Sequence, residues 1–147
     1  MKNLIKTFFV LFLILASCSK KEGCRDADGL NYDPDAESDA RCRYTQAIFY
    51  APGDRVGGNG NRISRIEVFL GPTPGEQLIG EITLFNQDSP NDCNPPEGGF
   101  SYELPGGGVE YIFLTRYYYE NNTNESGGSF TLQASRDQTC RVFSLTL

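Results

Sequence analysis

The pattern of apolar and polar positions divides the chain into three parts. Residues 4–15 are mostly apolar, but this run is shorter than the ~20 residues that a membrane-spanning helix needs. Residues 19–44 are polar and acidic, with Leu30 as the only large aliphatic side chain. After residue 44, short apolar runs are separated by Gly, Pro, Asn and Asp. We therefore expect three regions, at residues 1–17, 18–44 and 45–147, of which only the last can form a conventional core.

Alternation of apolar and polar side chains predicts β-strands throughout the third part. Ile66 and Val68 alternate with Glu67, for example, which leaves one face of that strand suited to a core. We expect strands near residues 45–51, 63–70, 77–85, 99–104, 109–119, 128–135 and 139–146, and no helix of useful length. Residues 121–128 are predicted to be a hairpin loop. Seven strands in about 100 residues fit an all-β, immunoglobulin-like antiparallel sandwich.

The N-terminal segment has the features of an export signal. Lys2 and Lys6 accompany the apolar run, which ends in small residues before Cys18. The tetrapeptide Leu15-Ala16-Ser17-Cys18 resembles the lipobox of bacterial lipoproteins. That resemblance implies cleavage before Cys18 and a lipid on its sulfur, and Ser19 in the next position implies the outer membrane, with the leaflet undetermined. An ordinary signal peptide and an uncleaved anchor are the alternatives.

Assigning Cys18 to lipid leaves an even number of cysteines. The chain has five in total, so Cys24, Cys42, Cys93 and Cys140 remain, and an oxidising compartment favours their pairing. Three pairings are open from sequence, and proximity along the chain favours Cys24 with Cys42 and Cys93 with Cys140. A zinc site is the rival, but the chain contains no histidine and no C-x-x-C spacing.

Two further stretches resemble known protein segments. Residues 23–44 resemble a short cysteine-bounded motif of secreted bacterial proteins, which implies a disulfide-closed spacer. The matching residues are Gly23, Cys24, Asp26, Asn31, Tyr32, Asp33, Pro34, Ala36, Asp39, Cys42 and Tyr44. The order of pieces in residues 45–147 is similar to small β-domains of secreted proteins, which implies a sandwich and carries over no catalytic residue.

Composition excludes several classes of function. Removing residues 1–17 leaves 11 basic and 19 acidic residues, a formal charge of −8, so nucleic acid is a poor partner. The absence of histidine excludes Ser-His-Asp and Cys-His catalysis and the usual zinc hydrolases. We therefore expect a protein that is not an enzyme.

Two groups of acidic residues could still carry chemistry. The first, in the spacer, offers oxygen ligands for calcium, although no register matches the EF-hand order and a hydrated acidic spacer is the favoured interpretation. Its candidate ligands are Asp26, Asp28, Asp33 and Asp35. The second could supply paired carboxylates for glycoside hydrolysis, but solvent-facing partners of Arg65 or Arg116 are favoured. Its members are Glu67, Glu81, Glu103 and Glu110.

The aromatic strand at residues 109–119 supplies the candidate binding residues. Tyr111, Phe113, Tyr117 and Tyr119 share one face of the strand, and Arg116 and Tyr118 share the other. Exposed aromatic rings and arginine can stack on sugars or anchor a protein interface, so Arg116, Tyr118 and Tyr119 are candidates for contact with a protein or glycan ligand. The alternative is that these rings fill the core and support cross-strand pairs.

Together these features predict a lipoprotein with a binding or envelope-structural module. A small carboxylate-dependent hydrolase and an accessory subunit of an envelope complex are the alternatives. The hydrolase requires two close carboxylates in a cleft, and the subunit requires a contiguous exposed apolar patch.

Overall fold

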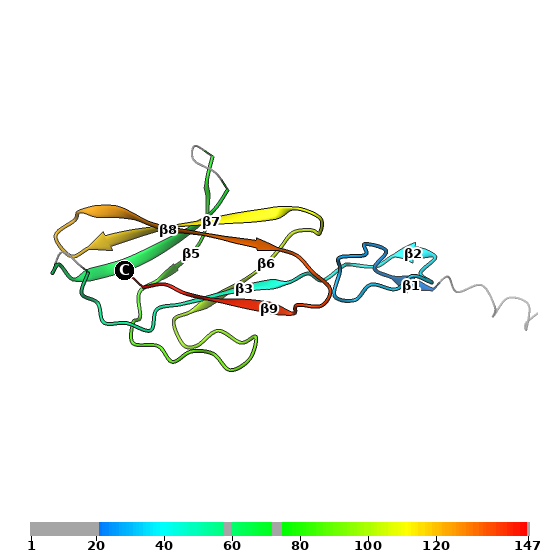
Figure 1. Ribbon diagram of the computed structural model, residues 1–147, viewed down its shortest axis with the longest axis horizontal. Coiled ribbons are helices and arrows are strands. Elements are labelled where there is room, and N and C mark those ends of the chain that lie inside the picture. The colour runs from blue at the N-terminus through cyan, green and yellow to red at the C-terminus, as the bar shows by residue number, and fades with distance from the viewer. Residues whose placement is uncertain (1–20, 58–59, 72–74, 147) are drawn as a thin grey trace, which may run out of the picture.

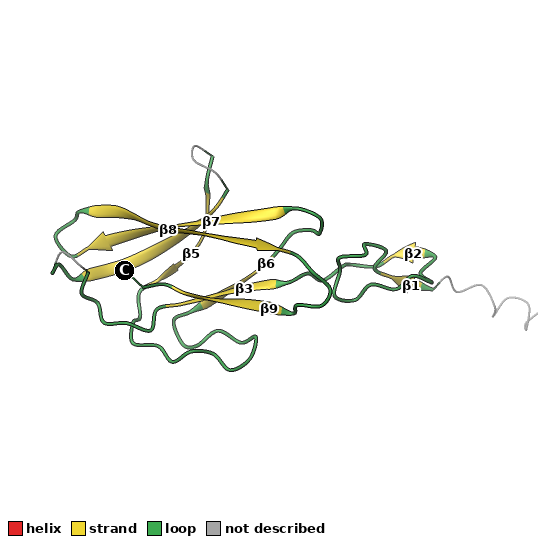
Figure 2. Ribbon diagram, viewed as in Figure 1, coloured by secondary structure: helices red, strands yellow, loops and turns green. Residues whose placement is uncertain are grey.

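The computed structural model describes residues 21–57, 60–71 and 75–146, and within them the chain is all-β (Figure 2). The predicted signal and Cys18 lie outside the described residues. Two short strands, β1 (Glu22–Gly23) and β2 (Ser38–Asp39), belong to the spacer. The remaining strands are β3 (Gln46–Tyr50), β4 (Ile63–Leu70), β5 (Gln77–Ile82), β6 (Phe100–Glu103), β7 (Glu110–Tyr119), β8 (Asn124–Gln133) and β9 (Cys140–Ser144). The expected all-β class and the approximate position of each of these seven strands are confirmed.

The seven strands form two sheets with the core between them (Figure 1). One sheet has the order β6-β3-β9 and the other β5-β4-β7-β8. All neighbours are antiparallel except β3 and β9, which are parallel. In constant-type immunoglobulin domains, one sheet contains the first, second, fifth and fourth strands of the chain, in that order. The strand order here differs from that expectation, because alternation specifies which side chains face the core but not which strand lies alongside.

The core is centred on a group of phenylalanine rings. Phe49 of β3 stacks with Phe100 and Phe143 at centroid distances of 5.1 and 5.3 Å, and meets the edge of Phe113 at 5.2 Å. These rings come from β3, β6, β7 and β9, so they join both sheets. Burial of large aromatic side chains from distant parts of the chain is the main force that holds the sheets together.

Strand β8 begins earlier than the sequence indicated. The segment expected as a loop at residues 121–128 enters the sheet at Asn124, whose register partner is Tyr118. Glycine permits this pairing, because a Cβ on Gly127 would lie 2.1 Å from the ring of Tyr117. The turn is therefore short, and Asn122 adopts a left-handed conformation within it, with φ 63°.

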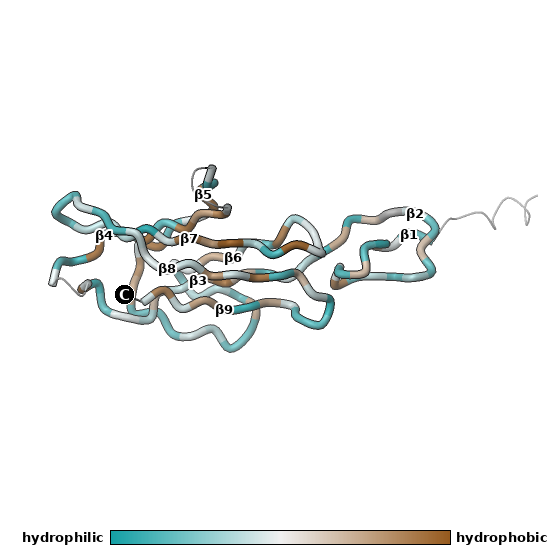
Figure 3. The backbone as a smooth tube through the Cα atoms, turned by 45° about the horizontal axis from the view of Figure 1, so that its top comes forward, coloured by the Kyte–Doolittle hydropathy of each residue, from teal (hydrophilic) through white to brown (hydrophobic). Residues whose placement is uncertain are grey.

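Both disulfides join the cysteines that proximity favoured. Cys24 bonds to Cys42 and closes the spacer, and Cys93 bonds to Cys140. The second bond ties the long segment between β5 and β6 to the start of β9. The spacer projects from one end of the sandwich along the long axis of the molecule (Figure 1), and it is more hydrophilic than the strands of the sandwich (Figure 3).

Candidate functional site

The four-stranded sheet presents a face directed away from the core, which we call the outer face. Three neighbouring rows of its side chains cross the strands in register. The first row is Arg65, Tyr118 and Asn124, the second is Glu81, Glu67, Arg116 and Ser126, and the third is Leu78, Phe69, Leu114 and Ser129. A cation-aromatic row, a charged row and a largely apolar row therefore lie next to one another.

Two arginine–aromatic contacts dominate the outer face. The guanidinium carbon of Arg65 lies 3.9 Å from the ring centre of Tyr118, and that of Arg116 lies 4.7 Å from the ring centre of Phe69. We call these four residues the arginine–aromatic cluster. Such stacking orients the planar guanidinium group and lowers its freedom to move.

Each arginine of the cluster is also paired with a carboxylate. Arg65 Nε lies 3.0 Å from Glu67 Oε1, and Arg116 Nη2 lies 3.0 Å from Glu76 Oε1. The pKa of Arg65 is raised chiefly by its hydrogen bond to Glu67. The pKa of Arg116 is raised first by its contact with the Tyr118 side chain and further by Glu76. Both guanidinium groups are therefore charged, oriented and locally neutralised.

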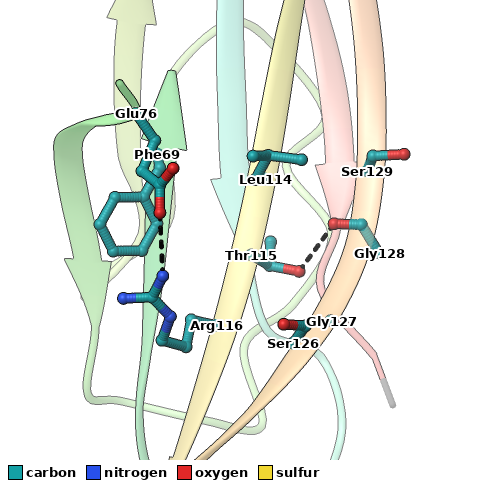
Figure 4. A pocket seen from close by; sticks show the side chains of 9 residues that line it. All are labelled: Phe69, Glu76, Leu114, Thr115, Arg116, Ser126, Gly127, Gly128 and Ser129. Carbon is teal, nitrogen blue, oxygen red and sulfur yellow. Dashed lines mark hydrogen bonds and ion pairs between the residues drawn. The ribbon is translucent and has the colours of Figure 1, made fainter. Parts of the chain in front are cut away.

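Arg116 and Phe69 of the cluster also line a small pocket (Figure 4). It has a volume of about 170 Å³, and it lies between the Glu76–Arg116 pair and strand β8. The Oε2 atom of Glu76 is buried there and has no hydrogen-bond partner among the described residues. A shift in the register of β7 and β8 between Leu114 and Arg116 shapes the pocket, and Thr115 donates a hydrogen bond of 3.1 Å to the carbonyl of Gly128 at this point.

The structure separates the three residues expected to bind a ligand. Arg116 and Tyr118 lie on the outer face, as the alternation of the strand indicated. Tyr119 faces the core, is only 3% exposed and donates a hydrogen bond to Glu125. Tyr119 is therefore a buried packing residue, and it does not belong to the same surface as Arg116 and Tyr118. The side chain of Tyr119 points toward the core, as do those of Tyr117 and Phe113.

The acidic residues of the spacer are held in two separate groups rather than in one. Asp26 accepts hydrogen bonds from the Tyr44 hydroxyl at 2.7 Å and from the amide of Asp28 at 3.0 Å. Asp33 lies 2.9 Å from Lys21 Nζ and accepts a hydrogen bond from the amide of Asp35. Over the part of the chain that is described, no three acidic, cysteine or histidine side chains are grouped to hold a metal ion. The four candidate calcium ligands are thus not brought together.

These contacts change the acid–base properties of the spacer. The pKa of Asp26 is lowered chiefly by its hydrogen bond from Tyr44, and that of Asp33 is lowered chiefly by Lys21. The same hydrogen bond, together with burial, raises the pKa of Tyr44 to about 12. The carboxylates therefore serve as structural acceptors within the spacer.

The spacer is docked against the end of the sandwich. The Tyr44 amide donates a hydrogen bond of 3.0 Å to Glu103 in β6. Asp28 packs so closely against Gly107 that a Cβ at that glycine would lie 2.3 Å from the Cβ of Asp28. Residues 105–108 read Pro-Gly-Gly-Gly, and nothing in that pattern pointed to a contact with the spacer.

The four carboxylates considered for hydrolysis occupy three different places. Glu67 and Glu81 are register partners on the outer face, and Glu67 is paired with Arg65. Glu103 lies in the other sheet and accepts a hydrogen bond from the Tyr44 amide. Glu110 begins β7 and lies opposite Gln133. The fold does not gather them into one cleft. Glu76, which does line a pocket, was missed because it follows a glycine and precedes a strand without any recognisable motif.

The described residues include no helix that could cross a membrane. Comparison of the chain with protein-family models, with curated proteins and with solved structures found no match.

Proposed function

We propose that this chain is a lipoprotein, anchored to the outer membrane through Cys18, whose sandwich binds a ligand of the cell envelope without catalysis. The observation that supports binding is the arginine–aromatic cluster on the outer face. Arginine and tyrosine are the side chains that most often dominate binding surfaces, since they combine large contact area with directed hydrogen bonds.

The cluster is prepared for binding before a ligand arrives. The side chains of Arg65 and Arg116 are 40% and 35% exposed, so they are accessible although their guanidinium groups are already stacked and paired. Ordering a free arginine on binding costs about 0.5–1.5 kcal/mol, and much of that cost is avoided when the side chain is held in advance.

Site-specific photo-crosslinking tests the binding surface. A photoreactive phenylalanine analogue in place of Tyr118 should give a discrete cross-linked species when the full-length protein is irradiated in cells. Val142 provides the matched control, because it is 36% exposed on β9 of the other sheet. Equal cross-linking from both positions, or none from position 118, would contradict binding at the outer face.

The anchor is tested separately by metabolic labelling. Radiolabelled palmitate should enter the wild-type protein and should be absent from Cys18→Ser, which should also leave the membrane fraction. Cys93→Ser, which changes a different cysteine, should retain the label. Label in Cys18→Ser would contradict the lipid assignment, and protease treatment of intact cells in the same experiment reports the leaflet.

A further inference from the structure

The buried oxygen of Glu76 is the starting point for assigning a ligand to the pocket on the outer face. Glu76 Oε1 is engaged by Arg116 at 3.0 Å, but Oε2 is buried without a hydrogen-bond partner among the described residues. A buried carboxylate oxygen that has lost its water and gained no hydrogen bond destabilises the protein. A ligand that occupies the pocket would therefore be favoured if it donates a hydrogen bond at this atom.

The neighbouring charges restrict what that donor is. The Arg116 guanidinium lies next to Glu76 and disfavours a bare cation in the pocket. Glu76 itself, with Glu67 and Glu81 in the same row as Arg116, disfavours an anion. A neutral ligand group is therefore favoured. It should donate a hydrogen bond to the Glu76 carboxylate and accept one from the Arg116 guanidinium. Hydroxyl groups on adjacent carbon atoms have this property.

The walls and size of the pocket further restrict which ligand it can hold. Phe69 and Leu114 contribute apolar surface, and Ser126 and Ser129 contribute hydroxyl groups along β8. A volume of about 170 Å³ is below the ~300–1,000 Å³ of sites that enclose a complete small molecule. The pocket suits one ring of a longer ligand, with apolar C–H groups on one side and hydroxyls on the other.

We infer that the pocket between Glu76, Arg116 and Ser126 binds one sugar ring of a neutral oligosaccharide. This inference rests on the proposed function, because it places the ring on the outer face and extends the chain of sugars from Arg116 toward Tyr118 within the arginine–aromatic cluster. Tyr118 and its stacked Arg65 lie in the row next to that of Arg116, and they provide a planar surface for the adjoining ring.

Isothermal titration calorimetry of the full-length protein in detergent tests the inference. The probes are neutral hexasaccharides of glucose, mannose and xylose, and a hexagalacturonate serves as the anionic comparison. At least one neutral hexasaccharide should bind, and hexagalacturonate should bind at least tenfold more weakly. Glu76→Gln should weaken the binding about tenfold, because a charge-assisted hydrogen bond is replaced by a neutral one.

Matched variants separate the pocket from its surroundings. Glu81→Gln changes a carboxylate on the same face that neither lines the pocket nor pairs with an arginine of the cluster, so it should alter affinity less than threefold. Ser126→Leu fills the pocket and should abolish binding, whereas Thr131→Leu, an exposed outer-face position farther along β8, should not. Thermal unfolding of each variant confirms that it is folded.

Two outcomes would overturn the assignment. One is that no neutral hexasaccharide binds, and the other is that Glu76→Gln and Glu81→Gln have equal effects. If photo-crosslinking at position 118 captures a protein while no saccharide binds, the proposed binding function stands and the sugar assignment is wrong. If neither experiment detects a ligand at the outer face, both proposals are wrong.

Discussion

The spacer and the sandwich reach ordered structures by different means. The sandwich encloses a cluster of buried aromatic and aliphatic side chains that joins its two sheets. Among the described residues of the spacer, Cys24 is the only buried hydrophobic one, and order comes from a disulfide, carboxylate hydrogen bonds and the Lys21–Asp33 ion pair. A short acidic segment can thus be well ordered without a hydrophobic core, provided that it is closed covalently and docked on a larger domain.

The largest expected effect is the loss of a central ring from the sandwich. Phe49→Ala removes contacts with three other phenylalanines, so the free energy of unfolding should fall by about 3–5 kcal/mol. Urea denaturation followed by near-ultraviolet circular dichroism measures this change. Val142→Ala, at a partly exposed site, should lose less than about 1 kcal/mol. Similar losses in the two variants would argue against a core centred on Phe49.

Opening the spacer disulfide should have the next largest effect, but a local one. For a loop with a sequence separation of 18, the entropy model gives about 3 kcal/mol of stabilisation. In Cys24→Ser combined with Cys42→Ser, limited proteolysis should cleave residues 25–41 rapidly while the melting temperature of the sandwich changes little.

The other disulfide is the control for that experiment. Cys93→Ser combined with Cys140→Ser should instead lower the melting temperature of the sandwich, because this bond joins the β5–β6 segment to β9. Equal melting temperatures for the two double variants would contradict the division between spacer and sandwich.

A smaller effect is expected at the junction between the two regions. Tyr44→Phe removes the hydroxyl that donates to Asp26, a change of about 1 kcal/mol. Amide hydrogen exchange should accelerate at Asp28 and Leu30. The Asp28 amide donates a hydrogen bond to the Asp26 side chain, and the Leu30 amide donates one to the Arg43 carbonyl. Tyr32→Phe, within the same spacer, should leave both rates unchanged. Unaltered exchange in Tyr44→Phe would show that the hydroxyl does not support the docked arrangement.

The smallest effect is a dependence of spacer order on pH. Asp26 and Asp33 have lowered pKa values when folded, so their stabilising contribution is present above the ordinary value of 3.8 and is lost as the pH falls through the lowered values. Tyr44 behaves in the opposite sense. Its contribution is complete below pH 10 and is lost as the pH rises through its folded pKa of about 12.

Nuclear magnetic resonance of spacer amides across this range measures both limits. Asp26→Asn should weaken the acid transition, while the signals of core residues in the sandwich should stay constant through the acid limb. A spacer transition that coincides with global unfolding of the sandwich would remove the distinction between the two regions.

The sequence was sufficient for those features that depend on local pattern. The alternation around Ile66 and Val68 predicted a half-buried strand, and proximity along the chain predicted the cysteine pairs, because short loops cost less entropy to close. The opposite faces of Arg116 and Tyr117 also followed from the period of a strand.

Features that depend on contacts between distant segments could not be predicted in this way. The parallel pairing of β3 with β9 joins residues nearly 100 positions apart, and hydrophobic alternation does not identify such a partner. Residues 124–128 have little intrinsic tendency to form a strand. They are extended because they pair with the aromatic end of β7. Glu76 became a candidate only when the fold placed it beside Arg116.

The docked spacer also determines how the protein would stand on a membrane. If Cys18 carries lipid, three steps of ~3.8 Å separate its Cα atom from that of Lys21, so at most about 11 Å of chain lies between the lipid and the first described residue. The number of residues alone therefore limits how far the spacer can lie from such a lipid. The strands of the sandwich run along the long axis of the molecule (Figure 1), and the outer face runs beside that axis. A module held upright would therefore present the outer face sideways, toward neighbours in the plane of the membrane, and a tilt of the spacer would change the direction in which that face points.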